Sequence, residues 1–235
     1  MKLSISYYSS CGPRERNEDA VSVLETKDGM LAVVADGLGG HGQGELASAM
    51  VVNALNQTMI SGQPSEAVLK EAIDRANREI FEKHTDSQQM KSTVAALLLT
   101  EQAGCCIHVG DSRVYQFRDG AIVHQTQDHS VAQLAVLVGE ITQDQLRDHP
   151  DQNKLVRAIG GPKEPKIDSK CLDVRPGDCF LLCSDGFWKP VTEQAMETAL
   201  KRAESACHWL QLMRTDAQRE TTDNHTAVAV MVLDS

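Results

Sequence analysis

The sequence predicts an α+β fold in which antiparallel sheets are covered by helices. Two observations lead to this prediction: β-type runs follow one another with short hairpin signals between them, and helix-type runs occur in separate groups. The chain has 235 residues, of which 41% are hydrophobic and 24% are charged. This length and composition predict one medium-sized globular domain, residues 1–235, and are too apolar for a disordered chain.

Runs rich in β-branched and apolar residues predict the strands. In chain order, the expected strands are 20–25, 30–35, 93–100, 105–109, 113–118, 121–124, 166–174, 179–183 and 226–233. Turn signals such as Lys27-Asp28-Gly29 and Asp119-Gly120 join several of them as hairpins. No low-complexity linker divides the chain.

Apolar residues three or four positions apart predict the helices. The expected apolar faces are Ala47, Val51, Ala54 and Leu55; Leu69, Ile73, Ala76 and Ile80; and one long face of Met196, Leu200, Ala203, Cys207 and Leu210. Gln63-Pro64-Ser65 is a start signal for the second helix. The weak, mixed pattern from about 129 to 160 predicts a flap-like excursion over the surface.

Charge and cysteine usage exclude several classes of protein. Acidic residues outnumber basic ones 33 to 23, giving a formal charge of −10, which disfavours nucleic-acid binding through Lys and Arg. The seven cysteines have no CxxC spacing, and several lie in apolar runs, so we expect reduced thiols and a cytoplasmic location. The N-terminus lacks the apolar region of a signal peptide, and no run approaches the ~20 residues that span a bilayer. We therefore expect no nucleic-acid partner and no membrane partner.

Aspartates stand where predicted apolar strands end or begin. Asp36, Asp111 and Asp185 each follow such a run, and Asp223 precedes the last one. A single Asp-Gly or Asp-Asn pair is an ordinary turn former. Several carboxylates at one sheet edge, however, would repel one another unless cations lay among them. Oxygen donors suit Mg²⁺ or Mn²⁺, and no zinc spacing is present, so the pattern predicts a multi-metal carboxylate site.

Other nucleophiles are disfavoured by the motifs that the chain lacks. There is no Cys-x₅-Arg, no Gly-x-Ser-x-Gly and no phosphate-binding Gly-x₄-Gly-Lys loop. The glycine-rich stretch 37–44 has no lysine and is interpreted as a loop that frames Asp36. A metal-bound water is the remaining candidate nucleophile. Arg14 has the chemistry to hold a phosphate monoester bidentately beside such a centre, and the alternative is an exposed surface charge.

Taken in order, these residues resemble the metal-dependent serine/threonine protein phosphatases of the protein phosphatase 2C (PPM) family, in their stand-alone bacterial form. The matching stretches are Gly12-x-Arg14-x-x-Asn17-Glu18-Asp19, Val34-Ala35-Asp36-Gly37-Leu38-Gly39-Gly40-His41, Val109-Gly110-Asp111-Ser112-Arg113, Gln127-Asp128-His129-Ser130, His149-Pro150 with Asn153-x-Leu155-x-Arg157-Ala158-x-Gly160, Cys183-Ser184-Asp185-Gly186, and Asp223-Asn224. Each stretch alone is a weak signal, but together they span nearly the whole chain in the family's order.

The resemblance implies a four-layer α-β-β-α sandwich, with two antiparallel sheets flanked by helix pairs and metal ions at one edge. It implies two Mn²⁺ or Mg²⁺ ions bridged by Asp36, with the Gly37 carbonyl on the second ion. Asp185 and Asp223 would complete the first ion, and Asp111 would share a third, weaker ion with Asp185. Arg14 is implied to hold the substrate phosphate. Glu18 and Asp19 are implied to lie next to the metals and to orient bound waters.

The implied reaction is hydrolysis of phosphoserine or phosphothreonine by a water activated at the binuclear centre, without a phosphoenzyme intermediate. His41 is the family-matched candidate for the general acid, and the alternatives are an exposed bystander histidine or a metal-bound water. Leu38 stands where some eukaryotic relatives carry a histidine.

The implied partners are a phosphoprotein and a serine/threonine kinase whose action the chain opposes, and we expect a monomer. In its aromatic residues Phe187-Trp188 and Trp209, the chain resembles phosphatases that accompany type VI secretion clusters. The alternative is that these aromatics belong to a packed helix core. Two competing functions stay open: a metal-dependent phosphoesterase acting on a small-molecule phosphate or a phosphodiester, and a non-catalytic phosphoprotein-binding module. The second would show a gap in the acid set, and none is visible.

Overall fold

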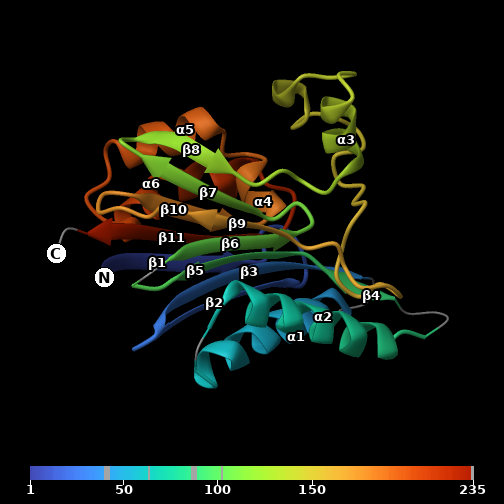
Figure 1. Cartoon of the computed structure of the whole chain (residues 1–235). Helices are drawn as coiled ribbons and strands as arrows, with labels where there is room; N and C mark the ends of the chain where they lie inside the picture. Colours follow the sequence, from blue (N-terminus) through green and yellow to red (C-terminus); the bar gives the residue numbers. More distant parts are fainter. Residues whose placement is uncertain (40–42, 63, 86–88, 102, 234–235) are drawn as a thin grey trace.

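Two antiparallel sheets face each other between layers of helices in the computed structural model of the chain (Figure 1). It describes residues 1–39, 43–62, 64–85, 89–101 and 103–233. The first sheet has the order β1-β11-β10-β7-β8, with strands Lys2–Ser10, His225–Leu233, Cys179–Cys183, Arg113–Arg118 and Ala121–Gln125. The second sheet has the order β2-β3-β5-β6-β9, with strands Asp19–Thr26, Gly29–Gly39, Val94–Leu99, Gly104–Val109 and Asp168–Leu172. Strand β4 (Met90–Ser92) pairs with the end of β3.

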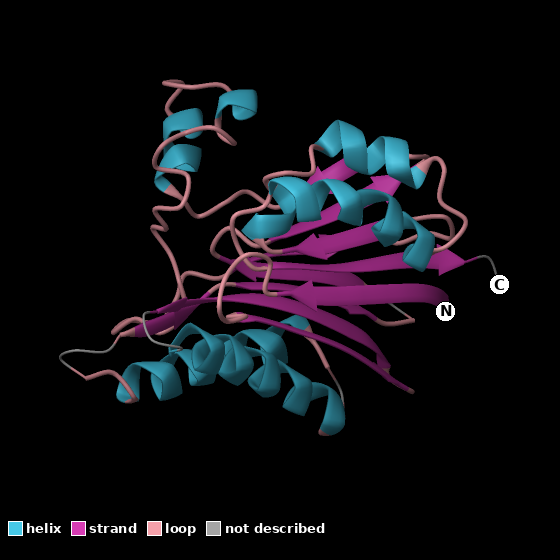
Figure 2. Ribbon diagram, turned by 180° about the vertical axis from the view of Figure 1, so that it is seen from behind, coloured by secondary structure: helices cyan, strands magenta, loops and turns pink. Residues whose placement is uncertain are grey.

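Helices cover the outer faces of both sheets, as the view from behind shows (Figure 2). Helices α1 (Gln43–Ile60) and α2 (Glu66–Glu82) cover the second sheet, and α4 (Asp185–Trp188), α5 (Glu193–Leu200) and α6 (Ala206–Glu220) cover the first. The predicted four-layer α-β-β-α architecture is confirmed. No helix among the described residues is both long enough and apolar enough to cross a membrane.

Three hydrophobic layers hold the sandwich together, and strand β3 shows why its sequence is apolar throughout. Leu31 and Val33 pack toward α1 and α2, whereas Ala32 and Val34 pack into the layer between the two sheets. A strand buried on both faces needs apolar residues at every position rather than at every second one. The run 30–35 therefore carries the signal of a central strand.

Three expectations about elements are corrected by the structure. Strand β1 was not expected, although it pairs with β11 over its whole length. The single long helix is two helices, because the Ser205 side chain accepts a hydrogen bond from the His208 N–H and so caps a new helix. The short helix α4 was also missed. All seven cysteines are free, as predicted, but Cys11, Cys171 and Cys207 are exposed rather than part of a core.

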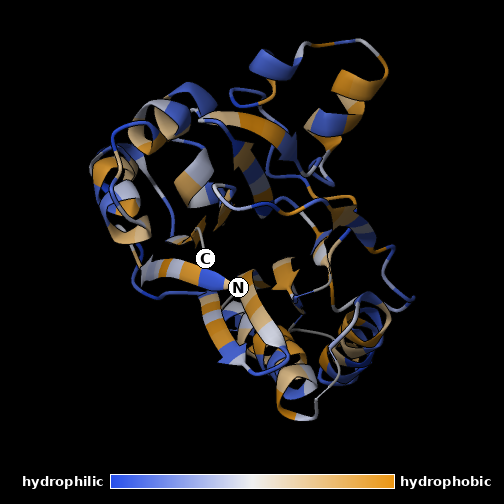
Figure 3. Ribbon diagram, turned by 60° about the vertical axis from the view of Figure 1, so that its left-hand side comes forward, coloured by the Kyte–Doolittle hydropathy of each residue, from blue (hydrophilic) through white to orange (hydrophobic). Residues whose placement is uncertain are grey.

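The segment between β8 and β9 stands away from the two sheets (Figure 1). It contains helix α3 (Val131–Leu137) and the short 3₁₀ turn η1 (Gln143–Gln145). Hydrophobic and hydrophilic residues are mixed along this segment (Figure 3), and Leu134, Leu137 and Val138 are exposed. This is the segment for which the sequence predicts a flap, and we refer to residues 129–160 as the flap.

Candidate metal centre and phosphate site

Asp36 and Asp19 face each other across the paired strands β3 and β2. The sequence suggests that β3 ends at Asp36, but the strand runs on to Gly39 because Gly37–Gly39 pair with β4. The Asp36 N–H donates to Thr93 Oγ1 at 2.9 Å, and the Asp36 carbonyl accepts from the Thr93 N–H at 2.8 Å. Asp36 therefore projects from a rigid strand rather than from a turn.

Asp111 follows strand β6 in a position that a glycine and a tryptophan fix. Gly110 has a φ of +103°, and a Cβ there would lie 2.6 Å from Thr93 Cγ2, so this turn requires glycine. The Trp188 indole N–H donates to the Asp111 carbonyl at 2.9 Å. Through this bond, helix α4, which covers the first sheet, positions Asp111, which follows strand β6 of the second sheet.

Asp185 and Asp223 are brought together because the start of helix α4 lies close against the segment before strand β11. A Cβ on Gly186 would lie 2.0 Å from the Asn224 carbonyl oxygen and 3.2 Å from the Asp223 Cβ, so only glycine allows this contact. The buried Ser184 hydroxyl donates to Asp19 Oδ2 at 2.7 Å. The two sheets are thus linked directly beneath the candidate metal ligands.

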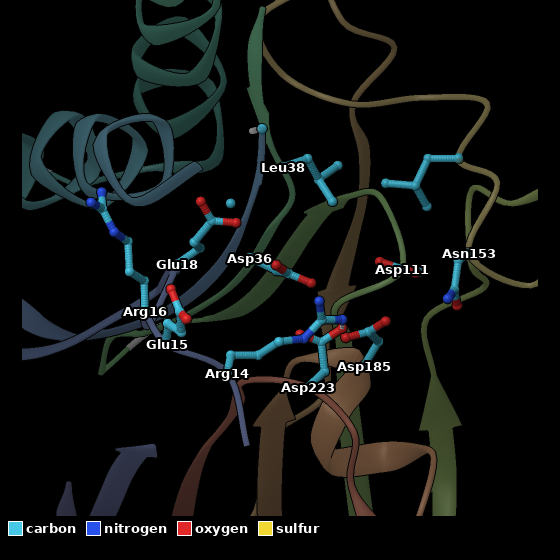
Figure 4. A pocket seen from close by; sticks show the side chains of 13 residues that line it. Arg14, Glu15, Arg16, Glu18, Asp36, Leu38, Asp111, Asn153, Asp185 and Asp223 are labelled. Carbon is cyan, nitrogen blue, oxygen red and sulfur yellow. Dashed lines mark hydrogen bonds and ion pairs between the residues drawn. The ribbon is translucent and has the colours of Figure 1, made fainter. Parts of the chain in front are cut away.

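One cavity of about 580 Å³ collects most of the predicted site residues. Its lining includes Arg14, Glu18, Asp36, Gly37, Asp111, Asp185 and Asp223. Figure 4 shows the four aspartates turned toward a common region, with the Arg14 guanidinium beside Asp223. Asp19 lies next to Asp36 rather than in the lining, and His41 lies outside the described residues. The roles of these residues stay predictions.

The carboxylates carry a charge problem that divalent ions would solve. Burial raises the pKa of Asp36 well above its ordinary value, and the charges of Asp19, Asp185, Asp111 and Asp223 add to the effect. Burial also raises the pKa of Asp19 to about 7, against the opposing hydrogen bonds of nearby hydroxyls.

Asp19 Oδ1 is buried and has no hydrogen-bond partner among the described residues. An oxygen-only donor set with excess negative charge suits Mg²⁺ or Mn²⁺. The side chains that could hold such ions are those of Asp36, Asp185, Asp223 and Asp111, together with the carbonyl of Gly37.

Arg14 lies at the rim of the cavity in a defined orientation. Its Nη2 donates to Asp223 Oδ2 at 2.9 Å, and its Nε donates to the Thr222 carbonyl at 3.1 Å. Its Nη1 forms no hydrogen bond within the part of the chain that the structure describes, and 56% of its side chain is exposed. The guanidinium is therefore held on one edge and free on the other to bind an anion.

Glu18 is joined to the same edge through its backbone. Its carbonyl accepts hydrogen bonds from the Gly37 N–H at 3.1 Å and from the Ser48 hydroxyl at 2.6 Å, and its N–H donates to Asn224 Oδ1 at 2.8 Å. Burial raises the pKa of the Glu18 carboxyl, although the Gly44 N–H opposes this.

Lys189 and Asn153 belong to the site, although the sequence reasoning assigned neither a role there. The Lys189 ammonium contacts Asp185 Oδ2 and donates to Asn153 Oδ1 at 2.5 Å, and Asn153 lines the cavity. A signal was available, because Lys189 is four residues after Asp185, the spacing of a helical ion pair. The short helix that makes this spacing effective was the feature missed.

A second cluster of metal-binding residue types lies apart from the cavity, and we call it the His129 cluster: His108, His129, Arg157 and Asp168. Ligand atoms of the two histidines and Asp168 lie within 4.8 Å of one another. The two rings are stacked, however, with centroids 4.5 Å apart and planes at 24°, so their in-plane nitrogens do not converge on one ion. Arg157 already donates to Asp168 at 2.9 Å. We describe the cluster as a hydrogen-bonded structural element.

The double antiparallel sandwich, with an acid-lined cavity and an arginine at its rim, is the arrangement expected of a metal-dependent phosphatase. The protein phosphatase 2C family matches residues 11–227. The chain belongs to the protein phosphatase 2C family. The predicted resemblance and the predicted enzyme class, a metal-dependent protein phosphatase, are confirmed.

The chain is similar to named bacterial phosphatases in sequence and in structure. It is 33% identical over 198 residues to the serine/threonine phosphatase stp of Listeria monocytogenes, covering 80% of this chain and 79% of the relative. The serine/threonine phosphatase of S. agalactiae superimposes with a TM-score of 0.90 at 29% identity, covering 98% of this chain and 100% of that one.

Two further solved structures bear on the site and its setting. The catalytic domain of the phosphatase PstP, in complex with two manganese ions, has a TM-score of 0.83 at 32% identity and covers 99% of this chain and 100% of that one. PppA of Pseudomonas aeruginosa, described as a key regulatory component of a type VI secretion system, has a TM-score of 0.79 at 27% identity, with 99% of both chains covered.

Proposed function

We propose that the cavity hydrolyses phosphoserine and phosphothreonine in proteins with two Mn²⁺ or Mg²⁺ ions held by Asp36, Asp185, Asp223 and the Gly37 carbonyl. The observation that carries the proposal is the convergence of four carboxylates from both sheets, of which Asp111 and Asp185 are buried, on one cavity with Arg14 at its rim. The two-manganese structure of PstP supports the choice of metal. When bound, the ions would lower the pKa of a water molecule and offset the charge of the phosphate.

The chain's own residues would bind and orient the substrate. The free edge of the Arg14 guanidinium would donate hydrogen bonds to the non-bridging phosphate oxygens. Glu18 and Asp19, beside the metal ligands, would accept hydrogen bonds from water molecules and fix their orientation. His41 stays a prediction for the proton donor to the leaving oxygen, because it lies outside the described residues. The third ion predicted between Asp111 and Asp185 is not required by this scheme.

A groove beside the cavity supports a protein rather than a small molecule as substrate. The groove has a volume of about 600 Å³ and shares Leu38, Asn153 and Leu155 with the cavity. Its other lining residues include four cations, Lys91, Arg157, Lys163 and Lys166, and a single acid, Glu164. An open channel that continues from the phosphate site suits a polypeptide that extends on either side of a phosphorylated residue.

We also propose the cellular setting in which the enzyme acts. It would be a cytoplasmic monomer that reverses the action of a serine/threonine kinase. The likeness to PppA supports a type VI secretion setting as the specific case. The buried Phe187, Trp188 and Trp209 belong to the core under α4–α6, so these aromatics support packing rather than partner recognition.

The decisive test replaces one carboxylate oxygen at the centre of the site. Asp36→Asn should lose at least about three orders of magnitude in the rate of para-nitrophenyl phosphate hydrolysis with Mn²⁺, because a neutral amide is a weaker ligand for a divalent ion than a carboxylate. Asp216→Asn, on the exposed face of α6, is the matched control and should keep wild-type activity. Near wild-type activity of Asp36→Asn would show that the metal assignment is wrong.

The substrate class needs a separate comparison. The wild-type enzyme should hydrolyse a phosphothreonine peptide much faster than bis-(para-nitrophenyl) phosphate, and EDTA should stop both reactions. A preference for the diester would support the small-molecule or diesterase alternative instead. Absence of any metal-dependent hydrolysis would support the non-catalytic binding module.

A further inference from the structure

Lys189 contacts Asp185, one of the two carboxylates to which the third metal ion is predicted to bind. Its ammonium contacts Asp185 Oδ2, and only 21% of its side chain is exposed. The side chain is fixed by a second bond, since the ammonium also donates to Asn153 Oδ1 at 2.5 Å. A lysine held by two partners in a half-buried position is part of the site rather than a surface charge.

The local helix dictates this position. Ser184 precedes helix α4, which begins at Asp185, and Lys189 is the C-cap residue directly after it, with its N–H donating to the Asp185 carbonyl at 2.9 Å. In one helical turn the side chains of residues i and i+4 lie on the same face. Asp185 and Lys189 are therefore paired by the backbone, and Trp188 between them holds the Asp111 carbonyl.

The electrostatics connect Lys189 to both carboxylates. The positive charge of Lys189 interacts with the negative charges of Asp185, Asp111 and Asp223. A divalent ion between Asp111 and Asp185 would lie next to this ammonium and be repelled by it.

We propose that Lys189 is a built-in cation that replaces the third divalent ion between Asp111 and Asp185, so that this chain binds two metal ions rather than three. The inference rests on the proposed two-ion centre. Asp185 Oδ2 is taken by the ammonium, whereas Asp185 Oδ1 forms no hydrogen bond among the described residues and is left for an ion of that centre. The bond to Asn153 also attaches the flap to the same edge of the site.

The test counts bound metal directly. Apo protein prepared with EDTA is dialysed against MnCl₂ up to millimolar concentrations, and bound manganese per chain is measured by elemental analysis. Isothermal titration gives the number of binding steps. Wild type should bind two Mn²⁺ per chain. Lys189→Met, which keeps the length and loses the charge, should bind three, with an added weaker step.

Matched variants isolate the charge. Lys189→Arg should stay at two, because it keeps a cation beside Asp185, and Lys201→Met, at an exposed lysine, should also stay at two. Adding Asp111→Asn to Lys189→Met should return the count from three to two. Melting curves of each variant confirm that it is folded before the metal is counted.

The outcomes separate this inference from the proposed function. Three ions in wild type, or two in a folded Lys189→Met variant, would overturn the role of Lys189 and leave the two-ion phosphatase intact. Fewer than two ions in wild type would overturn the two-ion centre and, with it, the inference. A gain from two to three in Lys189→Met alone supports the proposal.

Discussion

At the scale of single residues, the site depends on side chains that are fixed by more than one bond. Arg14 shows this most clearly: Nη2 and Nε are held by Asp223 and by the Thr222 carbonyl, and only the remaining edge is available to an anion. An arginine held in this way loses little conformational entropy when phosphate binds. Arg16 lines the same cavity without any ion pair among the described residues.

This contrast predicts different effects for two neighbouring arginines. Arg14→Ala should lower kcat/KM for para-nitrophenyl phosphate roughly 10- to 100-fold, as expected when one or two charge-assisted hydrogen bonds are lost. Arg16→Ala, the control, should change it less than about threefold. The measurement is steady-state kinetics at saturating Mn²⁺. Equal effects of the two variants would contradict a specific phosphate contact of Arg14.

The sequence predicted the acidic residues of the site better than the basic ones. Asp36, Asp111, Asp185 and Asp223 were found because each adjoins an apolar run, and that pattern is local. Lys189 was missed because its spacing of four residues from Asp185 indicates an ion pair only within a helix, and α4 is too short to show a helical period. The second contact of Lys189, to Asn153 36 residues away, leaves no local signal.

At the scale of elements, the flap is attached to the sandwich through the His129 cluster. His129 Nδ1 accepts from the Gly110 N–H at 3.1 Å, so its Nε2 carries the proton that it donates to Asp168 Oδ2 at 3.2 Å. The neutral form is required, because a protonated ring could not accept from Gly110. Burial and the charge of the stacked His108 lower the pKa of His129 to about 4, although Asp168 opposes this shift.

The flap attachment should therefore weaken in acid. An unfolded histidine has a pKa of about 6.5, so the unfolded chain takes up a proton before the folded one does. Stability is lost as the pH falls from about 6.5 toward 4, and His129 should account for about 2 kcal/mol of this loss at pH 5. Urea unfolding of wild type and His129→Gln at pH 7.5 and pH 5 measures it.

The expected result is a smaller loss of unfolding free energy in His129→Gln than in wild type between the two pH values. His208→Gln, on α6, serves as the control and should behave like wild type. If wild type and His129→Gln lost the same free energy on acidification, the neutral state of His129 would not stabilise the fold.

Elements were predicted well where their pattern was uniform and poorly where tertiary pairing decided. Strands β3, β5 and β10 were recognised because they are buried on both faces and therefore apolar throughout. Strand β1 mixes serine, tyrosine and isoleucine on an edge, and only its pairing with β11 makes it a strand. The helix break at Ser205 follows from one capping hydrogen bond, which the apolar spacing does not reveal.

At the scale of the whole molecule, charge is distributed unevenly. The chain has a formal net charge of −10, so it repels acidic substrates at long range. The groove beside the cavity has the opposite sign, with Lys91, Lys163 and Lys166 exposed and without an ion pair among the described residues. The loop 160–163, which lines this groove, is held by the buried side chain of Asn77. This amide accepts hydrogen bonds from the Gly160 and Gly161 N–H groups and donates to the carbonyls of Gly161 and Lys163.

This arrangement predicts a preference for phosphoproteins with acidic residues near the phosphorylated one. The double variant Lys163→Gln/Lys166→Gln should raise KM about fivefold for a phosphothreonine peptide with flanking glutamates, since each exposed pair contributes up to about 1 kcal/mol. KM for para-nitrophenyl phosphate should not change, because that substrate does not reach the groove.

The double variant Lys83→Gln/Lys201→Gln removes the same charge elsewhere on the surface and should leave both constants at the wild-type value. Added salt, which screens exposed charges over about 10 Å at 0.1 M, should reduce the difference between wild type and the groove variant. If KM rose equally for the peptide and for para-nitrophenyl phosphate, the two lysines would act on the phosphate site itself, and the groove would have no part in selecting the substrate.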